Sequence, residues 1–134
     1  MKIKNLLSSV LFLFFASYFA QNTIEVMSFN IRLGSVDDGE NHWNIRKDKV
    51  KDLINYYEAD FVGLQEAQKP QINYLLENNS LYSFLGKPRD DGENSEFSCI
   101  FYLKNKYKVL EQNTFWLSET PEKSTKSWDA AYPR

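Results

Sequence analysis

The stretch ADFVGLQEAQ, residues 59–68, decides the fold, because its apolar run leads into Gln65 and the carboxylate of Glu66. Phe61 to Leu64 form a short, wholly apolar run, which is typical of a strand covered on both faces. Removing an ionised carboxylate from water costs several kcal/mol unless a partner compensates for it. Glu66 therefore lies either in solvent just past the strand end or next to a positively charged partner.

The residues before this strand predict a strand, a helix and a parallel pairing. Residues 24–31, IEVMSFNI, alternate like a strand, and a polar loop follows them. From Asn44 the pattern becomes helical, with an expected inner face of Ile45, Val50, Leu53, Ile54 and Tyr57. A helical crossover makes the two strands parallel, so that Asn30 and Glu66 emerge at one edge of the sheet, where open sheets bind ligands. Pattern alone leaves a second reading open, in which Asn30 caps a turn and Glu66 is solvated.

The residues after Glu66 predict one more helix and then consecutive strands. Pro70 suits the first turn of a helix that turns Ile72, Leu75 and Leu76 inward. The later pattern predicts strands at LYSFLG (81–86), FSCIFYL (97–103) and KYKVLEQNTFWL (106–117), followed by a polar loop to residue 134.

Several other conspicuous residues are expected to be structural. The lone cysteine, Cys99, lies in an apolar run and is expected to be buried. The pentapeptide DDGEN occurs at residues 37–41 and 90–94, and it predicts two acidic glycine turns, not calcium loops. We expect His42 to be an ordinary loop residue, and Arg89 and Arg134 to be surface or capping arginines. The three tryptophans, Trp43, Trp116 and Trp128, are expected to pack the core and its loops.

The first twenty residues predict an export signal. Lys2 and Lys4 precede an apolar block that is short for a membrane span, and Ala20 is a plausible cleavage point, with an uncleaved anchor as the alternative. Without residues 1–20 the 16 basic residues fall to 14 against 18 acids, a net charge of −4. We expect a secreted or periplasmic protein with no stable membrane insertion and no protein partner. The missing basic stripe weakly disfavours long nucleic acid as a ligand.

Five stretches in order, MSFNIR, FVGLQEA, FSCIFY, FWLSETP and WDAAYPR, resemble the endonuclease/exonuclease/phosphatase superfamily. The resemblance covers residues 24–134. It implies an α+β fold, the four-layer α/β/β/α sandwich of the full family domain, of which this chain supplies about the first half. It also implies that residues 21–134 are the N-terminal part of a truncated domain.

The resemblance implies a metal-dependent phosphoester hydrolase. Glu66 would be a ligand of a catalytic Mg²⁺ or Mn²⁺ ion, and Asn30 would hydrogen-bond the site and help to hold the metal or the nucleophile's partner. The family's Asp-x-Asn motif and late Asp-His pair do not occur in this sequence. We therefore expect the chain alone to be inactive or nearly so, with nucleic acid, sugar phosphate and lipid headgroup all open as substrates.

Two other functions remain as alternatives. A glutamate at a strand end also fits a glycosidase built on a (β/α)₈ barrel, although the chain is short and its βα alternation stops after residue 78. An exported, aromatic-rich, non-catalytic binding domain is the third reading, and its tryptophans would then form the binding surface.

Overall fold

The computed structural model describes residues 23–133 as a four-stranded sheet with two helices. The elements are β1 (Val26–Asn30), the 3₁₀ helix η2 (Gly39–Asn41), α2 (Trp43–Tyr57), β2 (Phe61–Gln68), α3 (Lys69–Glu77), β3 (Tyr82–Leu85) and β4 (Glu96–Leu103). The expected signal peptide lies outside the described residues. No helix within residues 23–133 is long and apolar enough to cross a membrane.

The sheet confirms the predicted βαβ unit. Its strand order is β1-β2-β4-β3, β1 runs parallel to β2, and the other two pairings are antiparallel. Asn30 is opposite Gln65, so that the last residue of β1 lies beside the residue before Glu66. The register therefore places the two predicted site residues at the same end of neighbouring strands.

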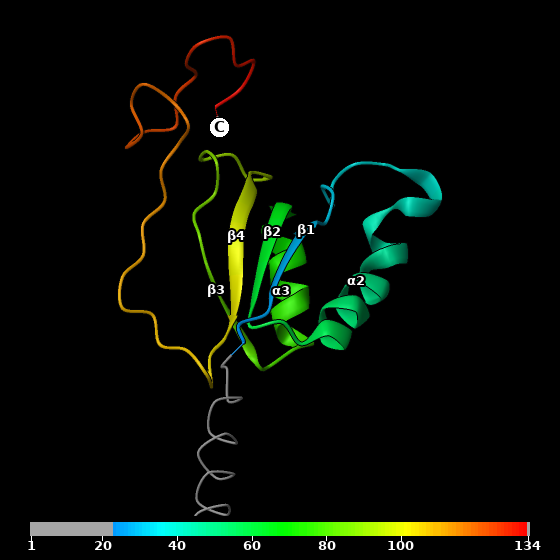
Figure 1. Cartoon of the computed structure of the whole chain (residues 1–134). Helices are drawn as coiled ribbons and strands as arrows, with labels where there is room; N and C mark the ends of the chain where they lie inside the picture. Colours follow the sequence, from blue (N-terminus) through cyan, green and yellow to red (C-terminus); the bar gives the residue numbers. More distant parts are fainter. Residues whose placement is uncertain (1–22, 134) are drawn as a thin grey trace, which may run out of the picture.

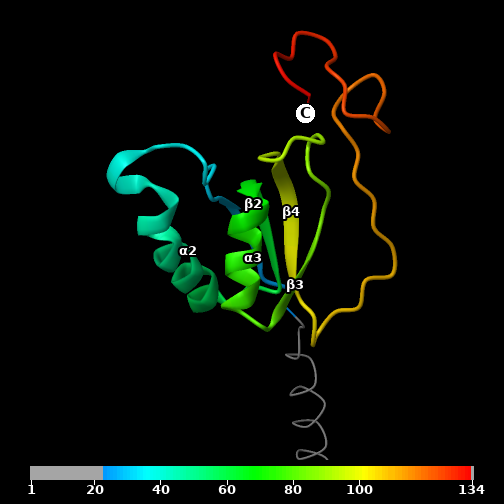
Figure 2. The same ribbon diagram turned by 180° about the vertical axis from the view of Figure 1, so that it is seen from behind.

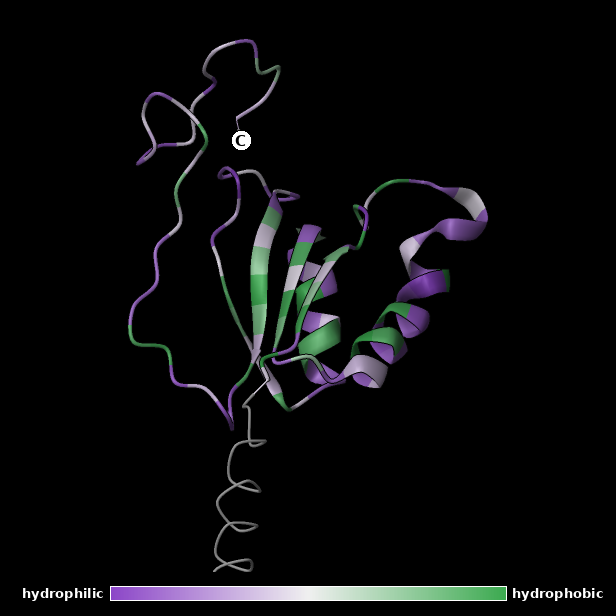
Figure 3. Ribbon diagram, in the orientation of Figure 1, coloured by the Kyte–Doolittle hydropathy of each residue, from purple (hydrophilic) through white to green (hydrophobic). Residues whose placement is uncertain are grey.

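Both helices cover the same face of the sheet (Figure 1, and from behind in Figure 2). The side chains of Val62, Leu64 and Phe101 point to that face and are almost completely buried, as are Ile72 and Leu75 of α3. Figure 3 shows the strands dominated by hydrophobic residues and α2 carrying much of the polar surface. The core therefore lies between this sheet face and the helices.

The opposite face of the sheet is open within the described residues. Val26 of β1 is 72% exposed and Ile100 of β4 is 47% exposed, although both lie within strands. Strand residues alternate between the two faces, so that each neighbour of an exposed residue packs on the helices. Along β2, Val62 and Leu64 on the helix side are completely buried, whereas Phe61 and Gly63 on the other side are partly buried, so this strand is covered fully on one face and in part on the other.

Helix α2 buries a narrower stripe than the sequence pattern predicted. Trp43, Val50 and Ile54 are buried, whereas Ile45 is 61% exposed and Leu53 is 37% exposed. At 3.6 residues per turn Ile45 lies about 140° around the helix from Val50, so one residue cannot pack on the sheet when the other does. Tyr57, in the last turn, is also exposed.

The strand expected at residues 106–117 does not form. The chain is irregular from Lys104 onward and runs beside β3 without a backbone ladder (Figure 1). Residues 106–117 do alternate in hydrophobicity, but a strand also needs a partner strand with free backbone groups. No segment among the described residues forms such a ladder with residues 106–117. The strands predicted at 81–86 and 97–103 are confirmed as β3 and β4.

Asp60 joins three segments at the end of the sheet where β2 begins. Its side chain is buried, Oδ2 accepts the amide of Glu25 at 2.9 Å, and Oδ1 accepts the ammonium group of Lys106 at 2.7 Å. The backbone carbonyl of Asp60 also accepts the amide of Leu103. The hydrogen bond from Lys106, followed by that from Glu25, lowers the pKa of Asp60 below its ordinary value of 3.8.

We predict that the Asp60 contacts make stability fall in acid. Because the pKa of Asp60 is lower in the folded chain than in the unfolded chain, its contribution is complete above pH 3.8 and is lost as the pH falls below that value. Urea unfolding at a series of pH values should show a decline in the free energy of unfolding below about pH 4 that is shallower in Asp60→Asn. An equally steep decline in both proteins would contradict the assignment.

Candidate functional site

A bulge at the end of β2 turns Glu66 toward β1. The antiparallel register between β2 and β4 shifts between Leu64 and Ala67, and Glu66 has a φ of 56°. A left-handed conformation costs a residue other than glycine about 1–2 kcal/mol, and bulges commonly re-aim side chains next to functional sites. The bulge breaks the strand alternation at this residue and brings its carboxylate to the sheet edge.

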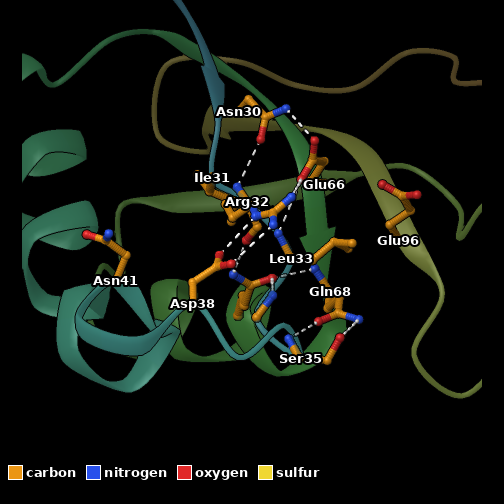
Figure 4. A network of polar contacts seen from close by, with 12 residues as sticks. Asn30, Ile31, Arg32, Leu33, Ser35, Asp38, Asn41, Glu66, Gln68 and Glu96 are labelled. Atoms are coloured by element: carbon orange, nitrogen blue, oxygen red, sulfur yellow. Dashed lines mark hydrogen bonds and ion pairs between the residues drawn. The ribbon is translucent and has the colours of Figure 1, made fainter.

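Asn30 and Glu66 meet directly, as predicted. Asn30 Nδ2 donates a hydrogen bond to Glu66 Oε1 at 2.9 Å, and the amide of Leu33 approaches Glu66 Oε2 at 3.4 Å (Figure 4). About a third of the Glu66 side chain is exposed, so the carboxylate remains open to a ligand. The two residues come from separate strands and form one polar centre.

Arg32 borders this centre and is held mainly by an acid of the following loop. Its backbone has a φ of 58°, and its amide donates to Asn30 Oδ1 at 2.9 Å. Its guanidinium binds Asp38 through Nε at 2.9 Å and Nη2 at 3.2 Å, while Nη1 lies 3.9 Å from Glu66 Oε2. The Arg32 hydrogen bond lowers the pKa of Asp38, so the acid stays charged and keeps the guanidinium beside Glu66.

Two buried glutamines attach the loop after β1 to the start of α3. Gln71, 1% exposed, accepts the amides of Gly34 at 3.2 Å and Gln68 at 2.9 Å, and it donates to the carbonyl of Arg32 at 2.9 Å. Gln68 accepts the amide of Ser35 at 2.8 Å. A Cβ added at Gly34 would lie 2.9 Å from the Gln71 side chain, so glycine is needed for this close approach.

Arg46 of α2 supports the same loop from the other side. Its guanidinium donates to three backbone carbonyls, those of Ile31 at 2.6 Å, Arg32 at 3.0 Å and Asn41 at 2.8 Å. Sequence reasoning missed Gln68, Gln71 and Arg46. The spacing of the two glutamines could have identified them. Gln68 is the N-cap of α3 and Gln71 follows three residues later, which is the spacing of a capping box.

The other residues considered in the sequence are not part of the polar centre. His42 caps α2, with Nδ1 accepting the amide of Asn44 at 3.2 Å. Cys99 is buried as expected, and burial raises the pKa of its thiol to about 12, which leaves no reactive thiolate at neutral pH. Arg89 pairs with Glu96, and Arg134 lies outside the described residues.

The three tryptophans differ in burial. Trp43 is buried and meets Tyr74 edge-on, as expected of a packing residue. Trp116 is partly buried and donates through Nε1 to the carbonyl of Arg89 at 2.7 Å. Trp128 is 71% exposed, so the expectation that it packs the core or its loops is wrong.

The donor set of the centre fits a hard divalent cation with an incomplete protein shell. Glu66 offers two carboxylate oxygens, and Asn30 Oδ1 keeps one lone pair beyond the hydrogen bond from Arg32. Within residues 23–133 no group of three or more His, Cys, Asp or Glu residues surrounds a common point. Mg²⁺ usually keeps several waters and binds through one or two carboxylates, so this set suits Mg²⁺ better than a fully protein-ligated ion.

Comparisons with known proteins agree on one family. The sequence model described as "Endonuclease/Exonuclease/phosphatase family" matches residues 27–124. A structure of an endonuclease/exonuclease/phosphatase from Bacteroides vulgatus is 39% identical, with a TM-score of 0.80 over 85% of this chain and 44% of that one. A mannosyl-6-phosphatase from Bacteroides thetaiotaomicron is 35% identical, with a TM-score of 0.78 over 84% of this chain and 43% of that one.

The chain thus spans less than half the length of these solved structures. A search among curated proteins found no match.

Proposed function

Because the chain belongs to the endonuclease/exonuclease/phosphatase family, we propose that Asn30 and Glu66 form part of a divalent-metal site for the hydrolysis of phosphoester bonds. The observation that carries the proposal is the 2.9 Å hydrogen bond between these side chains at the carboxyl ends of two parallel strands. The identity of 35% with a mannosyl-6-phosphatase supports a phosphoester as the substrate. Mg²⁺ or Mn²⁺ is the cation that the oxygen donors favour.

Glu66 supplies the only charged oxygens of the proposed metal site among residues 23–133. Asn30 Nδ2 and the amide of Leu33 each hold one carboxylate oxygen, so the carboxylate has a fixed orientation before any ligand arrives. A bound divalent ion would supply charge stabilisation to a phosphoryl oxygen. We propose Glu66 as its ligand and Asn30 as the residue that orients Glu66 and adds an amide oxygen.

Arg32 provides a positive charge next to the proposed metal site. Half of its side chain is exposed, and its position 3.9 Å from Glu66 Oε2 places it at the mouth of the site. A guanidinium binds phosphate oxygens through two parallel N–H groups. We propose that Arg32 contacts the phosphoryl group of the substrate while Asp38 fixes its direction.

The described residues offer no evident general base. The single histidine, His42, is engaged in capping α2, and the thiol of Cys99 is buried. General acid–base catalysis typically contributes about 10²–10⁴-fold to a rate. We therefore propose that the 134-residue chain by itself turns over a phosphoester slowly or not measurably. Separately, we propose that its first twenty residues direct its export.

The other two functions have less support. A (β/α)₈ glycosidase needs parallel strands throughout, whereas β4 is antiparallel to both of its neighbours. An aromatic binding surface would need several exposed tryptophans, whereas Trp43 lies in the core, Trp116 is partly buried and Trp128 alone of the three is exposed.

A chimera tests the proposal without requiring this chain to act alone. Residues 23–133 would replace the matched segment of the mannosyl-6-phosphatase. The match covers 84% of the present chain. We expect Mg²⁺-dependent hydrolysis of the mannosyl-6-phosphatase's own substrate that stops with EDTA and falls by about 10²–10³-fold in Glu66→Gln, since a charge-stabilising group is lost.

The chimera needs two controls. Circular dichroism must show that the Glu66→Gln chimera is folded, and Glu93→Gln, an exposed glutamate of the second acidic turn, should retain the full rate. Equal rates in the Glu66→Gln and unsubstituted chimeras would refute the assignment of Glu66.

A further inference from the structure

A shallow pocket lined mainly by polar residues lies near the Asn30–Glu66 centre. It has a volume of 300 Å³ and lies between the loop after β1 and the loop that leads into β4. Its lining includes Leu33, Ser35, Gln68, Arg89, Asp90 and Asn94. Leu33 lines the pocket and its amide approaches Glu66 Oε2 at 3.4 Å, so this residue connects the pocket with the proposed metal ligand. Figure 4 shows Gln68 hydrogen-bonded to Ser35, and Glu96 on the other side of Glu66 from Arg32 and Asp38.

The floor of the pocket is built by one buried side chain. Gln68 is 4% exposed, and its Nε2 donates to Ser35 Oγ at 3.0 Å and to the carbonyl of Asn94 at 2.7 Å. Its Oε1 accepts the amide of Ser35 at 2.8 Å. Gln68 therefore joins the two loops and fixes the distance between the pocket walls.

The Arg89 wall is fixed from outside the pocket. The carbonyl of Arg89 accepts hydrogen bonds from Trp116 Nε1 at 2.7 Å and Ser124 Oγ at 2.6 Å, two residues of the irregular tail. The amide of Arg89 donates to the carbonyl of Glu96 at 2.8 Å, and the two side chains form an ion pair. The tail thus holds the backbone of this wall, and Glu96 holds its side chain.

The charge of the pocket disfavours a second anionic group. Arg89 is already neutralised by Glu96, and Asp90 adds a further negative charge, so a polyanion gains no net attraction there. The lining contains no aromatic ring on which a base could stack, whereas hydroxyl, amide, carboxylate and guanidinium groups are all present. At 300 Å³ the pocket is at the small end of the usual range for ligand sites, which is about 300–1,000 Å³.

We propose that this pocket binds a neutral, hydroxyl-rich leaving group of about one sugar ring, with Arg89 and Asn94 as specificity residues. The inference rests on the proposed phosphoesterase function, because it places the alcohol part of the substrate beside a phosphoryl group at Glu66. It selects sugar phosphates over nucleic acid as the substrate class.

The test uses a free sugar, so that it does not depend on the metal site. Methyl α-D-glucoside is titrated into the ¹⁵N-labelled 134-residue chain in EDTA. We expect amide shifts at Ser35, Asn94 and Ser95, with a dissociation constant of about a millimolar, as the ligand efficiency of a small neutral molecule implies. The Glu66→Gln chain should show the same shifts, because the sugar does not need the metal ligand. Sugar binding can therefore be refuted independently of the proposed phosphoesterase function.

Substitutions locate the binding within the pocket. Arg89→Ala and Asn94→Ala should each weaken sugar binding, by about tenfold for Arg89 because a charged hydrogen bond is lost. Asn94→Ala keeps the backbone carbonyl that Gln68 binds, so it changes the pocket with little risk to the loop. Lys87→Ala, a basic residue of the same loop outside this pocket, should leave the affinity unchanged.

The proposal is overturned if the sugar produces no shift at Ser35 and Asn94. It is equally overturned if a dinucleotide shifts the same amides at lower concentration, or if Lys87→Ala weakens binding as much as Arg89→Ala.

Discussion

Phe101→Ala is expected to remove a large part of the stability of the folded chain. Phe101 is 1% exposed, and its ring centroid lies 6.3 Å from that of Tyr82 and 6.4 Å from that of Phe84. It occupies β4 opposite Val62 of β2, so it contacts the centre of the helix-covered face. Truncating a buried phenylalanine costs about 3–5 kcal/mol, a large part of the about 5–15 kcal/mol that typically holds a domain together.

Ile100→Ala is the matched control for this prediction. Ile100 precedes Phe101 on the same strand and points to the open face, where it is 47% exposed. Its truncation should change the free energy of unfolding by less than about 1 kcal/mol, as expected for a partly exposed site. Urea unfolding followed by circular dichroism measures both variants. Equal losses would mean that the open face is packed as tightly as the helix-covered face, contrary to the fold described above.

The two parallel strands and the helix between them could be predicted because they depend on local residue patterns and on the topology of a crossover connection. The apolar run before Glu66 and the alternation before Asn30 each define a strand, and the helix between them makes the pairing parallel. These rules place both residues at one sheet edge, and the structure brings them into contact at 2.9 Å. The chemistry proposed for them comes from the family resemblance, since pattern alone left it open.

The supporting contacts of the site depend on partners far apart in the sequence. Gln71 and Gly34 are 37 residues apart, and Asn94 is 26 residues from Gln68. The sequence does not distinguish a glutamine that only caps the first turn of its own helix from one that also hydrogen-bonds a distant loop. The left-handed conformation of Glu66 is also absent from the pattern, because it arises where β2 changes register against β4.

The errors in the predicted elements have the same origin. Residues 106–117 alternate like a strand, but a strand is a property of two segments, and no second segment pairs with this one among residues 23–133. Ile45 was assigned to the inner face of α2 on its hydrophobicity, although its angular position places it far from Val50.

Glu66→Gln is expected to abolish most of the cation affinity of the chain. The substitution keeps the shape of the side chain and removes the one charged ligand that residues 23–133 contribute to the proposed site. Altering a residue that merely orients a ligand typically costs 10–100-fold in metal affinity, so loss of the carboxylate itself should cost about 100-fold or more. Asn30→Ala should weaken binding by about 10–100-fold, because it removes the hydrogen bond that orients Glu66.

The two DDGEN segments, of which the first runs into the 3₁₀ helix η2 and is not the simple turn that was expected, provide the competing site that must be excluded. DDGEN at residues 37–41 and 90–94 gathers carboxylates at the surface, and such residues bind cations weakly and non-specifically. Glu93→Gln removes one charge from the second turn by the same chemical change as Glu66→Gln. It should leave the affinity of the Asn30–Glu66 centre unchanged.

Titration of Mn²⁺ into the ¹⁵N-labelled chain tests the metal site most directly, since a bound paramagnetic ion broadens the amides around it. We predict that the amides of Arg32, Leu33, Glu66 and Ala67 broaden first, and that Glu66→Gln requires about 100-fold more Mn²⁺ for the same effect. Earliest broadening at the two DDGEN turns, or identical titrations of the Glu66→Gln chain and the unsubstituted chain, would contradict the assignment of Asn30 and Glu66 to a cation.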